Sequence, residues 1–194
     1  MKQRTKEKIW VLREDRTAPE SEILALCEQT GFSSVGARLL YHRGLRTADA
    51  VKRFLCCEDT AFHSPFLLKD IRPAVARIRE ALARKEKIVI YGDYDVDGVT
   101  SVSMLYLYLT GMGGNVGYYI PSRSGEGYGL SRVALDKLRA EGVKLVITVD
   151  TGITACEEAE YAKEIGIDMV ITDHHECRAT LPDAVAVVNP HRPD

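Results

Sequence analysis

The chain of 194 residues has no long apolar run, no CxxC motif and no strong net charge. No stretch approaches the roughly 18 apolar residues of a membrane-spanning helix, and the polar residues after Met1 do not form a signal-peptide core. The five cysteines are odd in number and include no CxxC pair, which argues against a disulfide framework and a zinc ribbon. We therefore expect a cytoplasmic protein without a membrane association.

The net charge of −2, from 26 basic and 28 acidic residues, does not by itself indicate a nucleic-acid-binding protein. Domains that bind nucleic acid are usually basic overall. A dense acidic cluster can, however, hide a cationic surface elsewhere, and metal ions bound to that cluster reverse its local sign. The net charge therefore does not decide whether this chain binds nucleic acid, and the charge of each segment must be considered separately.

The amino-terminal part, residues 1–69, is predicted to be a small helical segment. Between residues 19 and 57 its apolar residues recur at helical spacing, and glycines interrupt them, which favours short helices. The apolar positions are Ile23, Leu24, Leu26, Leu39, Leu40, Val51, Phe54 and Leu55. Residues 59–68 have the composition of a connecting loop.

From Asp70 to Asp194 the pattern alternates between helix and strand. Short apolar runs predict strands at residues 87–91, 116–120, 144–149, 168–172 and 185–188. Helices are expected to begin at caps formed by Asp70, by Ser131 and by the capping box of Thr154 and Glu157. Another helix should follow Gly98. Repeated units of this length predict an α/β domain with a mainly parallel five-stranded sheet and helices on both faces.

Three of the predicted strands end in acidic or imidazole side chains. These residues are Asp93, Asp95 and Asp97 after the first strand, Asp150 after the third, and Asp173, His174 and His175 after the fourth. Ligands of parallel α/β sheets bind beyond the carboxyl ends of the strands, and neighbouring strands lie about 4.8 Å apart. We therefore expect these side chains to converge on one crevice.

Such a concentration of carboxylates favours a metal centre, because the negative charges would otherwise repel one another. Carboxylate oxygens combined with imidazole nitrogen suit Mn²⁺ or Mg²⁺. A carboxylate that bridges two ions about 3.5–4 Å apart would give the two-metal arrangement that hydrolyses phosphate esters. Gly98 and Gly152 are expected to permit tight turns after the strands, and the helix after Gly98 should direct its amino terminus at a bound phosphate.

Other interpretations of these residues exist. Asp-x-Asp-x-Asp-Gly also begins a calcium-binding EF-hand loop, but the acidic twelfth position would fall on Met104, and a strand precedes the motif. Asp150 alone could be a turn or capping residue, and two adjacent histidines alone are more often structural than ligating. The location of these residues at three strand ends favours the metal centre.

Several ordered motifs resemble those of the DHH phosphoesterase superfamily. They are Tyr91-Gly-Asp-Tyr-Asp-Val-Asp-Gly-Val-Thr-Ser101, Ile147-Thr-Val-Asp-Thr-Gly152 and Thr172-Asp-His-His-Glu176. Two further segments, Ile120-Pro-Ser-Arg-Ser-Gly-Glu-Gly-Tyr-Gly-Leu-Ser131 and Val188-Asn-Pro-His-Arg192, are similar to the branch of single-strand-specific DNA exonucleases. Some members of the superfamily carry a ligating histidine where this chain has Tyr91.

The resemblance implies a role for each residue of the site. The implied metal ligands are Asp95, Asp97, Asp150 as the bridge, and His174. The implied supporting residues are Asp93 and Asp173. The residues implied to contact or approach the substrate are His175, which would touch the scissile phosphate, and Arg123, Glu126 and Tyr128. An arginine and an aromatic ring suit phosphate contact and base stacking.

The resemblance also implies a metal-dependent exonuclease that removes nucleotides from the 5′ end of single-stranded DNA in recombination and repair. Single-strand-binding protein and a RecQ-type helicase would be partners of the full-length parent. The family's further catalytic aspartate and second domain, of the DHHA1 type, would lie beyond Asp194, so this chain is expected to be a truncated fragment with little activity alone. Two alternatives remain: a DHH hydrolase of short oligonucleotides, cyclic dinucleotides or pyrophosphate, and a catalytically silent module that binds DNA or a replication partner.

Overall fold

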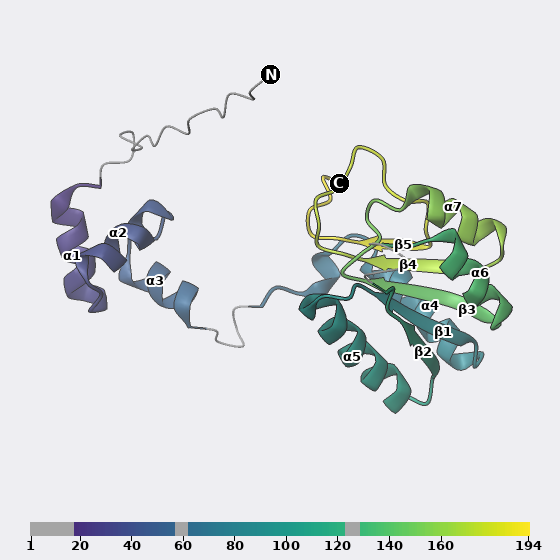
Figure 1. The fold of residues 1–194 in the computed structure, drawn as a ribbon. Coiled ribbons are helices and arrows are strands. Elements are labelled where there is room, and N and C mark those ends of the chain that lie inside the picture. Colours follow the sequence, from purple (N-terminus) through teal and green to yellow (C-terminus); the bar gives the residue numbers. More distant parts are fainter. Residues whose placement is uncertain (1–17, 57–61, 123–128) are drawn as a thin grey trace, which may run out of the picture. The chain divides into compact units, whose positions relative to one another are not determined.

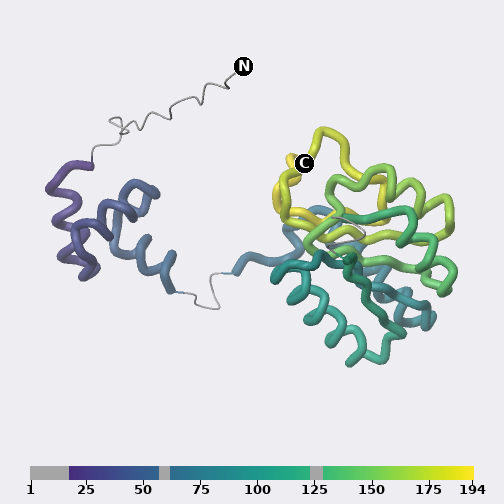
Figure 2. The backbone as a smooth tube through the Cα atoms, in the orientation of Figure 1, coloured from purple at the N-terminus to yellow at the C-terminus, as the bar shows by residue number. Residues whose placement is uncertain are grey.

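The computed structural model describes residues 18–56, 62–122 and 129–194. The chain divides into two compact units, Met1–His63 and Ser64–Asp194, which are traced in Figures 1 and 2 and described separately below. Within the described ranges, no helix has both the length and the apolar character required to cross a membrane.

The described part of the first unit contains three short helices, α1 (Glu20–Thr30), α2 (Ser34–His42) and α3 (Ala48–Leu55). Side-chain caps begin two of them: the Ser33 hydroxyl accepts a hydrogen bond from the Gly36 amide, and the Thr47 hydroxyl accepts one from the Ala50 amide. Five side chains form the buried core, namely Ile23, Leu26, Ala37, Leu40 and Val51. The predicted helical character of this segment is confirmed, although other apolar positions of the pattern, Leu24, Leu39, Phe54 and Leu55, are exposed.

The second unit contains a parallel five-stranded sheet in the order β2-β1-β3-β4-β5. The strands are β1 (Lys87–Gly92), β2 (Asn115–Tyr119), β3 (Val143–Val149), β4 (Asp168–Thr172) and β5 (Ala186–Val188). The predicted sheet is therefore confirmed. The short 3-10 helix η3 (Pro65–Leu67) precedes it.

Helices cover both faces of this sheet (Figure 1). Helices α4 (Ile71–Ala83) and α5 (Val96–Gly111) pack on one face, and α6 (Arg132–Ala140) and α7 (Cys156–Glu164) pack on the other. The alternation of side chains along a strand divides the core, because successive residues point to opposite faces. In β1, Ile88 and Ile90 face α4 and α5, whereas Val89 and Tyr91 face α6 and α7.

The predicted helix starts are only partly correct. Ser131 caps α6 as expected, since its hydroxyl accepts a hydrogen bond from the Ala134 amide. Asp70 stands before α4 but does not cap it; its carboxylate accepts hydrogen bonds from the Val187 amide and from Arg192 instead. The prediction of a capping box formed by Thr154 and Glu157 is wrong, because α7 begins at Cys156 without a side-chain cap. Long-range partners thus override local capping signals.

The helix after the first acidic motif begins earlier than predicted. Asp95 is the N-cap of α5, so Gly98 lies inside the first helical turn rather than in a preceding loop. The aspartates of this motif therefore occupy a strand end, a helix cap and a first helical turn.

Candidate metal centre

The site lies where the direction of chain progress across the sheet reverses. From β1 the chain moves outward to β2 and then returns to β3 on the other side of β1. In open parallel sheets ligands bind at this switch point, beyond the carboxyl ends of the two strands. Asp93 follows β1, Asp150 follows β3 and Asp173 follows β4, the next strand in the sheet. The topology therefore explains why residues distant in sequence converge.

Among the described residues, two groups of three side chains are close enough to hold a metal ion. One group is Asp93, Asp95 and Asp150, and the other is Asp150, His174 and His175. In each group the candidate ligand atoms lie within 4.8 Å of one another. Asp150 belongs to both groups and joins them into one centre.

The first group combines two buried carboxylates, those of Asp93 and Asp150, with the exposed carboxylate of Asp95. Asp93 is only 5% exposed, and its Oδ1 is buried and has no hydrogen-bond partner among the described residues. The Oδ1 of Asp95 accepts a hydrogen bond from the Gly98 amide at 2.9 Å, and this bond lowers the pKa of the Asp95 carboxyl. An ionised carboxylate beside a buried, unpartnered oxygen is an arrangement that a cation would stabilise.

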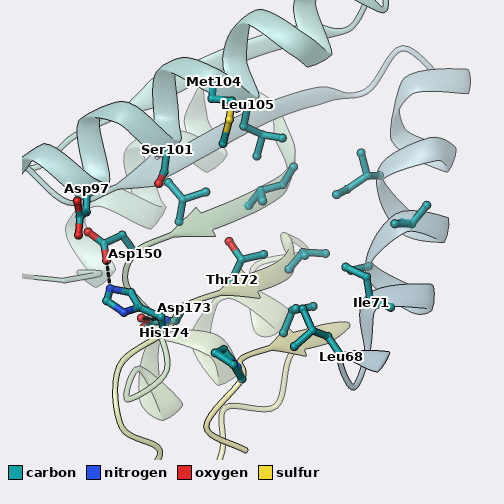
Figure 3. A pocket seen from close by; sticks show the side chains of 18 of the residues that line it. Leu68, Ile71, Asp97, Ser101, Met104, Leu105, Asp150, Thr172, Asp173 and His174 are labelled. Atoms are coloured by element: carbon teal, nitrogen blue, oxygen red, sulfur yellow. Dashed lines mark hydrogen bonds and ion pairs between the residues drawn. The ribbon is translucent and has the colours of Figure 1, made fainter. Parts of the chain in front are cut away.

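Asp150 is held in an uncommon backbone conformation. Its φ is 59°, in the left-handed region, and its side chain is buried. Burial raises the pKa of its carboxyl; the hydrogen bond with His174 opposes this rise, and the negative charge of Asp95 adds to it. The His174 Nε2 lies 2.9 Å from Asp150 Oδ1, as drawn in Figure 3. A strained aspartate between another carboxylate and an imidazole is typical of a functional site.

Asp173 organises the loop after β4. Its Oδ1 accepts hydrogen bonds from the His174 amide at 2.7 Å, the His175 amide at 3.1 Å and the His175 Nδ1 at 2.7 Å. Its Oδ2 accepts one from the Ile153 amide at 2.9 Å. Burial alone would raise the pKa of Asp173, but these bonds outweigh it and lower the pKa. The same carboxylate raises the pKa of His175.

Asp97 belongs to neither group of three. It lies in the first turn of α5 and lines one end of a cavity of about 620 Å³, together with Asp150, Asp173 and His174. Figure 3 shows that the rest of this cavity runs between α4 and α5, where Ile71, Met104 and Leu105 point inward. The polar end of the cavity is thus continuous with the candidate metal centre.

Tyr91 packs and bonds with residues outside both groups of candidate ligands. Its side chain is buried in the core between the sheet and helices α6 and α7, stacks on Tyr119 and donates a hydrogen bond to the Gly129 carbonyl at 3.0 Å. The period-2 alternation of β1 could have located it there, since Tyr91 shares a face with Val89. The three predicted substrate residues Arg123, Glu126 and Tyr128 lie outside the described residues.

Two glycines permit the close packing around the acidic residues. A Cβ on Gly98 would lie 2.3 Å from the carbonyl oxygen of Asp93, so this position requires the absence of a side chain. Gly152 has a φ of +109° and would also place a Cβ 2.8 Å from Thr148 Oγ1. The turn expected at Gly152 has the positive φ that glycine favours, whereas Gly98 allows helix α5 to approach the end of β1.

Asn189, which follows β5, is a residue of the site that the sequence patterns did not single out. It is 3% exposed, and its Nδ2 donates a hydrogen bond to the His175 carbonyl at 2.9 Å. Only the motif Val188-Asn-Pro-His-Arg192 indicated that this segment is special, without assigning a role to the asparagine. The contact depends on how β4 and β5 pair, which a local pattern does not reveal.

The side chains present fit a hard divalent cation. The two groups supply carboxylate oxygens and imidazole nitrogens without a thiolate. This combination suits Mn²⁺ or Mg²⁺ better than zinc. No donor from the part of the chain that the structure describes bonds to the buried Oδ1 of Asp93, so this oxygen is available to a cation.

These features define a class: a doubly wound parallel α/β domain with an acidic, histidine-containing centre at its switch point. The model of the DHH family, N-terminal domain, matches residues 87–194. The chain belongs to the DHH family, as the resemblance of its motifs implied.

Curated relatives and solved structures agree with this assignment. The single-stranded-DNA-specific exonuclease RecJ of Bacillus subtilis (strain 168) is 44% identical over 174 residues, which cover 90% of this chain and 22% of the relative. RecJ of Escherichia coli (strain K12) is 35% identical, over 81% of this chain and 27% of the relative. The chain therefore spans about a quarter of the length of these relatives.

Two crystal structures share the fold. A structure of exonuclease RecJ bound to manganese has a TM-score of 0.62 and 36% identity, and the match covers 69% of this chain and 34% of that one. RecJ from Thermus thermophilus in complex with Mn²⁺ has a TM-score of 0.65 and 28% identity, over 91% of this chain and 24% of that one. The resemblance to the single-strand-specific branch of the family is confirmed.

Proposed function

We propose that this chain supplies the metal-binding part of a hydrolase that removes nucleotides from the 5′ end of single-stranded DNA. The observation that carries this proposal is the position of Asp150, whose carboxylate lies within reach of both three-residue groups. A carboxylate shared in this way can bridge two ions, and two-ion centres are suited to phosphodiester hydrolysis.

Some residues of the site are proposed to bind the metal ions, and others are proposed to contact the substrate. Asp95, Asp150 and His174 are proposed ligands, and we add Asp93 to this set on the basis of its unpartnered oxygen. Asp97 remains a proposed ligand on the strength of the family resemblance and of its location at the polar end of the cavity. When bound, Mn²⁺ or Mg²⁺ would make water more acidic and stabilise the charge on phosphate oxygens.

His175 is proposed to contact the scissile phosphate. The Asp173 carboxylate raises the pKa of its imidazole and fixes the ring through Nδ1. A protonated imidazole held in this way offers a positive charge and a donor to phosphate oxygens. Arg123, Glu126 and Tyr128 remain proposed substrate contacts.

Single-stranded DNA is the proposed substrate because relatives that match most of this chain are named single-stranded-DNA-specific exonucleases. The 5′ polarity, the role in recombination and repair, the cytoplasmic location and cooperation with single-strand-binding protein and a RecQ-type helicase extend this proposal. We expect the 194 residues alone to have little nuclease activity, because they span only about a quarter of the length of those relatives.

The proposal is tested with a full-length protein that contains this chain. With Mn²⁺ present, single strands blocked at the 5′ end should resist digestion, whereas strands blocked at the 3′ end should be digested. Asp150→Asn, which keeps a side chain that tolerates the left-handed backbone, should reduce the rate by on the order of 10³-fold or more. The matched control is Asp136→Asn, an exposed carboxylate that accepts a hydrogen bond from Tyr161. An undiminished rate for Asp150→Asn would refute the bridging role.

Two other experimental outcomes would each favour a different function. Strong competition by dinucleotides or pyrophosphate against long single strands would favour a hydrolase of small substrates. Failure of the 194-residue chain to bind Mn²⁺ in a calorimetric titration, combined with tight binding of single-stranded DNA by the full-length protein, would favour a catalytically silent module.

A further inference from the structure

Asn189 is a buried polar side chain whose two hydrogen bonds join separate segments. Its Nδ2 donates to the His175 carbonyl at 2.9 Å, and its Oδ1 accepts from the His191 amide at 2.7 Å. A carbonyl can only accept and an amide N–H can only donate, so these partners determine the orientation of the Asn189 amide. Both functional groups of the side chain are therefore used.

The position of Asn189 in the sheet explains why it reaches the histidine loop. The regular pairing of β4 with β5 ends with Thr172 opposite Val188. One further backbone bond, from the Asp173 amide to the Val188 carbonyl at 3.1 Å, continues the pairing. The side chain of the next residue, Asn189, then bonds to His175, so it extends the connection between the strands beyond the regular ladder.

Asn189 and Asp173 hold His175 from opposite ends of its main chain. Asp173 accepts hydrogen bonds from the His175 amide and from Nδ1 of its ring. Asn189 binds the His175 carbonyl. With both ends fixed, the direction of the His175 ring and the placement of the adjacent His174 beside Asp150 are constrained together.

We propose that Asn189 is a positioning residue that holds the His174–His175 loop in the geometry required by the metal centre. This inference rests on the proposed function, because it assigns the loop to metal and phosphate. Groups that orient ligating residues from behind contribute strongly to metal affinity, and their loss typically costs about 10- to 100-fold. Asn189 would thus act on the centre through His175 rather than by contact with an ion.

The isosteric variant Asn189→Asp separates shape from hydrogen bonding. A carboxylate at this position still accepts from the His191 amide, but it cannot donate to the His175 carbonyl. In the metal-free 194-residue chain we expect amide hydrogen exchange at His174, His175 and Glu176 to become roughly fivefold faster, as the loss of one hydrogen bond implies. Exchange in the central strand β3 should not change. Asn115→Asp, the same substitution at an exposed residue of β2, is the matched control.

Two results would overturn the proposal. Unchanged exchange in the histidine loop of Asn189→Asp would show that the bond does not restrain it. Faster exchange throughout β3 would show a general structural role. Because no metal is present, this experiment does not depend on the proposed function.

A second measurement addresses the metal. Asn189→Ala adds no charge near the centre, and it should weaken Mn²⁺ binding to the chain about 10- to 100-fold in a calorimetric titration. An affinity equal to that of the unsubstituted chain would contradict the positioning role. If the unsubstituted chain binds no Mn²⁺, the proposed function fails, and the restraint of the loop is decided by the exchange experiment alone.

Discussion

Asp93 and Asp173 occupy equivalent places in the fold, directly after the parallel strands β1 and β4, but their carboxylates have different surroundings. Asp173 accepts four hydrogen bonds from Ile153, His174 and His175. Asp93 is similarly buried, and no residue within the described ranges bonds to its Oδ1. Both residues are aspartates at strand ends, and a sequence pattern does not distinguish them.

The comparison indicates how a buried carboxylate can be assigned a role. A carboxylate whose lone pairs are taken by backbone amides stabilises a loop, because each of those amides would otherwise be buried without an acceptor. A carboxylate with a buried unpartnered oxygen still has capacity for a cation. We therefore expect substitutions at Asp173 to change mainly stability and those at Asp93 to change mainly metal binding.

The largest effect on stability is expected from Asp173→Ala. The substitution leaves the amides of Ile153, His174 and His175 without their acceptor and should reduce the free energy of unfolding by about 3–5 kcal/mol. Thermal unfolding of the metal-free chain, followed by circular dichroism, should show a melting temperature lower by roughly 10 °C. Asp136→Ala, which removes an exposed carboxylate, should have little effect. A melting temperature of Asp173→Ala equal to that of the unsubstituted chain would contradict the stabilising role of Asp173, on which the comparison with Asp93 depends.

Gly98→Ala should have the next largest effect, because it pushes α5 away from the β1 end where Asp93 lies. The new Cβ would lie 2.3 Å from the Asp93 carbonyl oxygen, so the backbone must move. We expect a loss of about 2–4 kcal/mol in urea-induced unfolding.

Gly111→Ala in the same helix is the matched control for Gly98→Ala. No atom of the residues that the structure describes lies within 4 Å of the Cβ that would be added there. This substitution should stabilise the protein by up to about 1 kcal/mol through helix propensity and reduced flexibility of the unfolded chain. Equal effects of the two substitutions would show that close packing at Gly98 is unimportant.

Asp93→Asn should show the opposite behaviour to Asp173→Ala. In the metal-free chain we expect a change of less than about 1 kcal/mol, since no hydrogen bond to Oδ1 is lost. An excess of Mn²⁺ at about 100 times its dissociation constant should stabilise the unsubstituted chain by about 2.7 kcal/mol, and Asp93→Asn should lose most of this gain. Unfolding with and without Mn²⁺ measures both effects. An undiminished Mn²⁺ stabilisation would exclude Asp93 as a ligand.

The sheet and the convergence of the site could be predicted from the sequence because both follow from local rules. Short apolar runs such as that of β3 predicted the strands, and the carboxyl ends of parallel strands necessarily share one edge. The uses of individual carboxylates could not be predicted, because their partners come from distant residues. Asp70 has capping composition, but Val187 and Arg192 engage it from 117 and 122 residues away.

Tyr91 shows a limit of comparison with a family motif. Its position in the motif corresponds to a ligating histidine in some family members, but here its ring stacks on Tyr119 and its hydroxyl donates a hydrogen bond to the Gly129 carbonyl. Alignment with a ligand therefore does not by itself assign a metal-binding role to a residue.

Asp95 tests the comparison through the smallest expected effects, because its side chain combines a stabilising role with a candidate metal-binding role. Its Oδ1 caps α5 through the Gly98 amide, and it also belongs to the first group of candidate ligands. Asp95→Asn keeps a good capping side chain and should change the stability of the metal-free chain by less than about 0.5 kcal/mol, whereas Asp95→Ala should cost about 1 kcal/mol. Both variants should weaken Mn²⁺ binding measured by calorimetry.

The pair of variants at Asp95 separates capping from ligation. If Asp95→Asn binds Mn²⁺ as tightly as the unsubstituted chain, Asp95 is a cap alone, and the first group retains only Asp93 and Asp150. If Asp95→Asn binds Mn²⁺ more weakly while the stability of the metal-free chain is retained, the charged carboxylate of Asp95 ligates the ion. A carboxylate that accepts one amide bond can then still ligate, and only a carboxylate as fully occupied as that of Asp173 has no oxygen left for an ion.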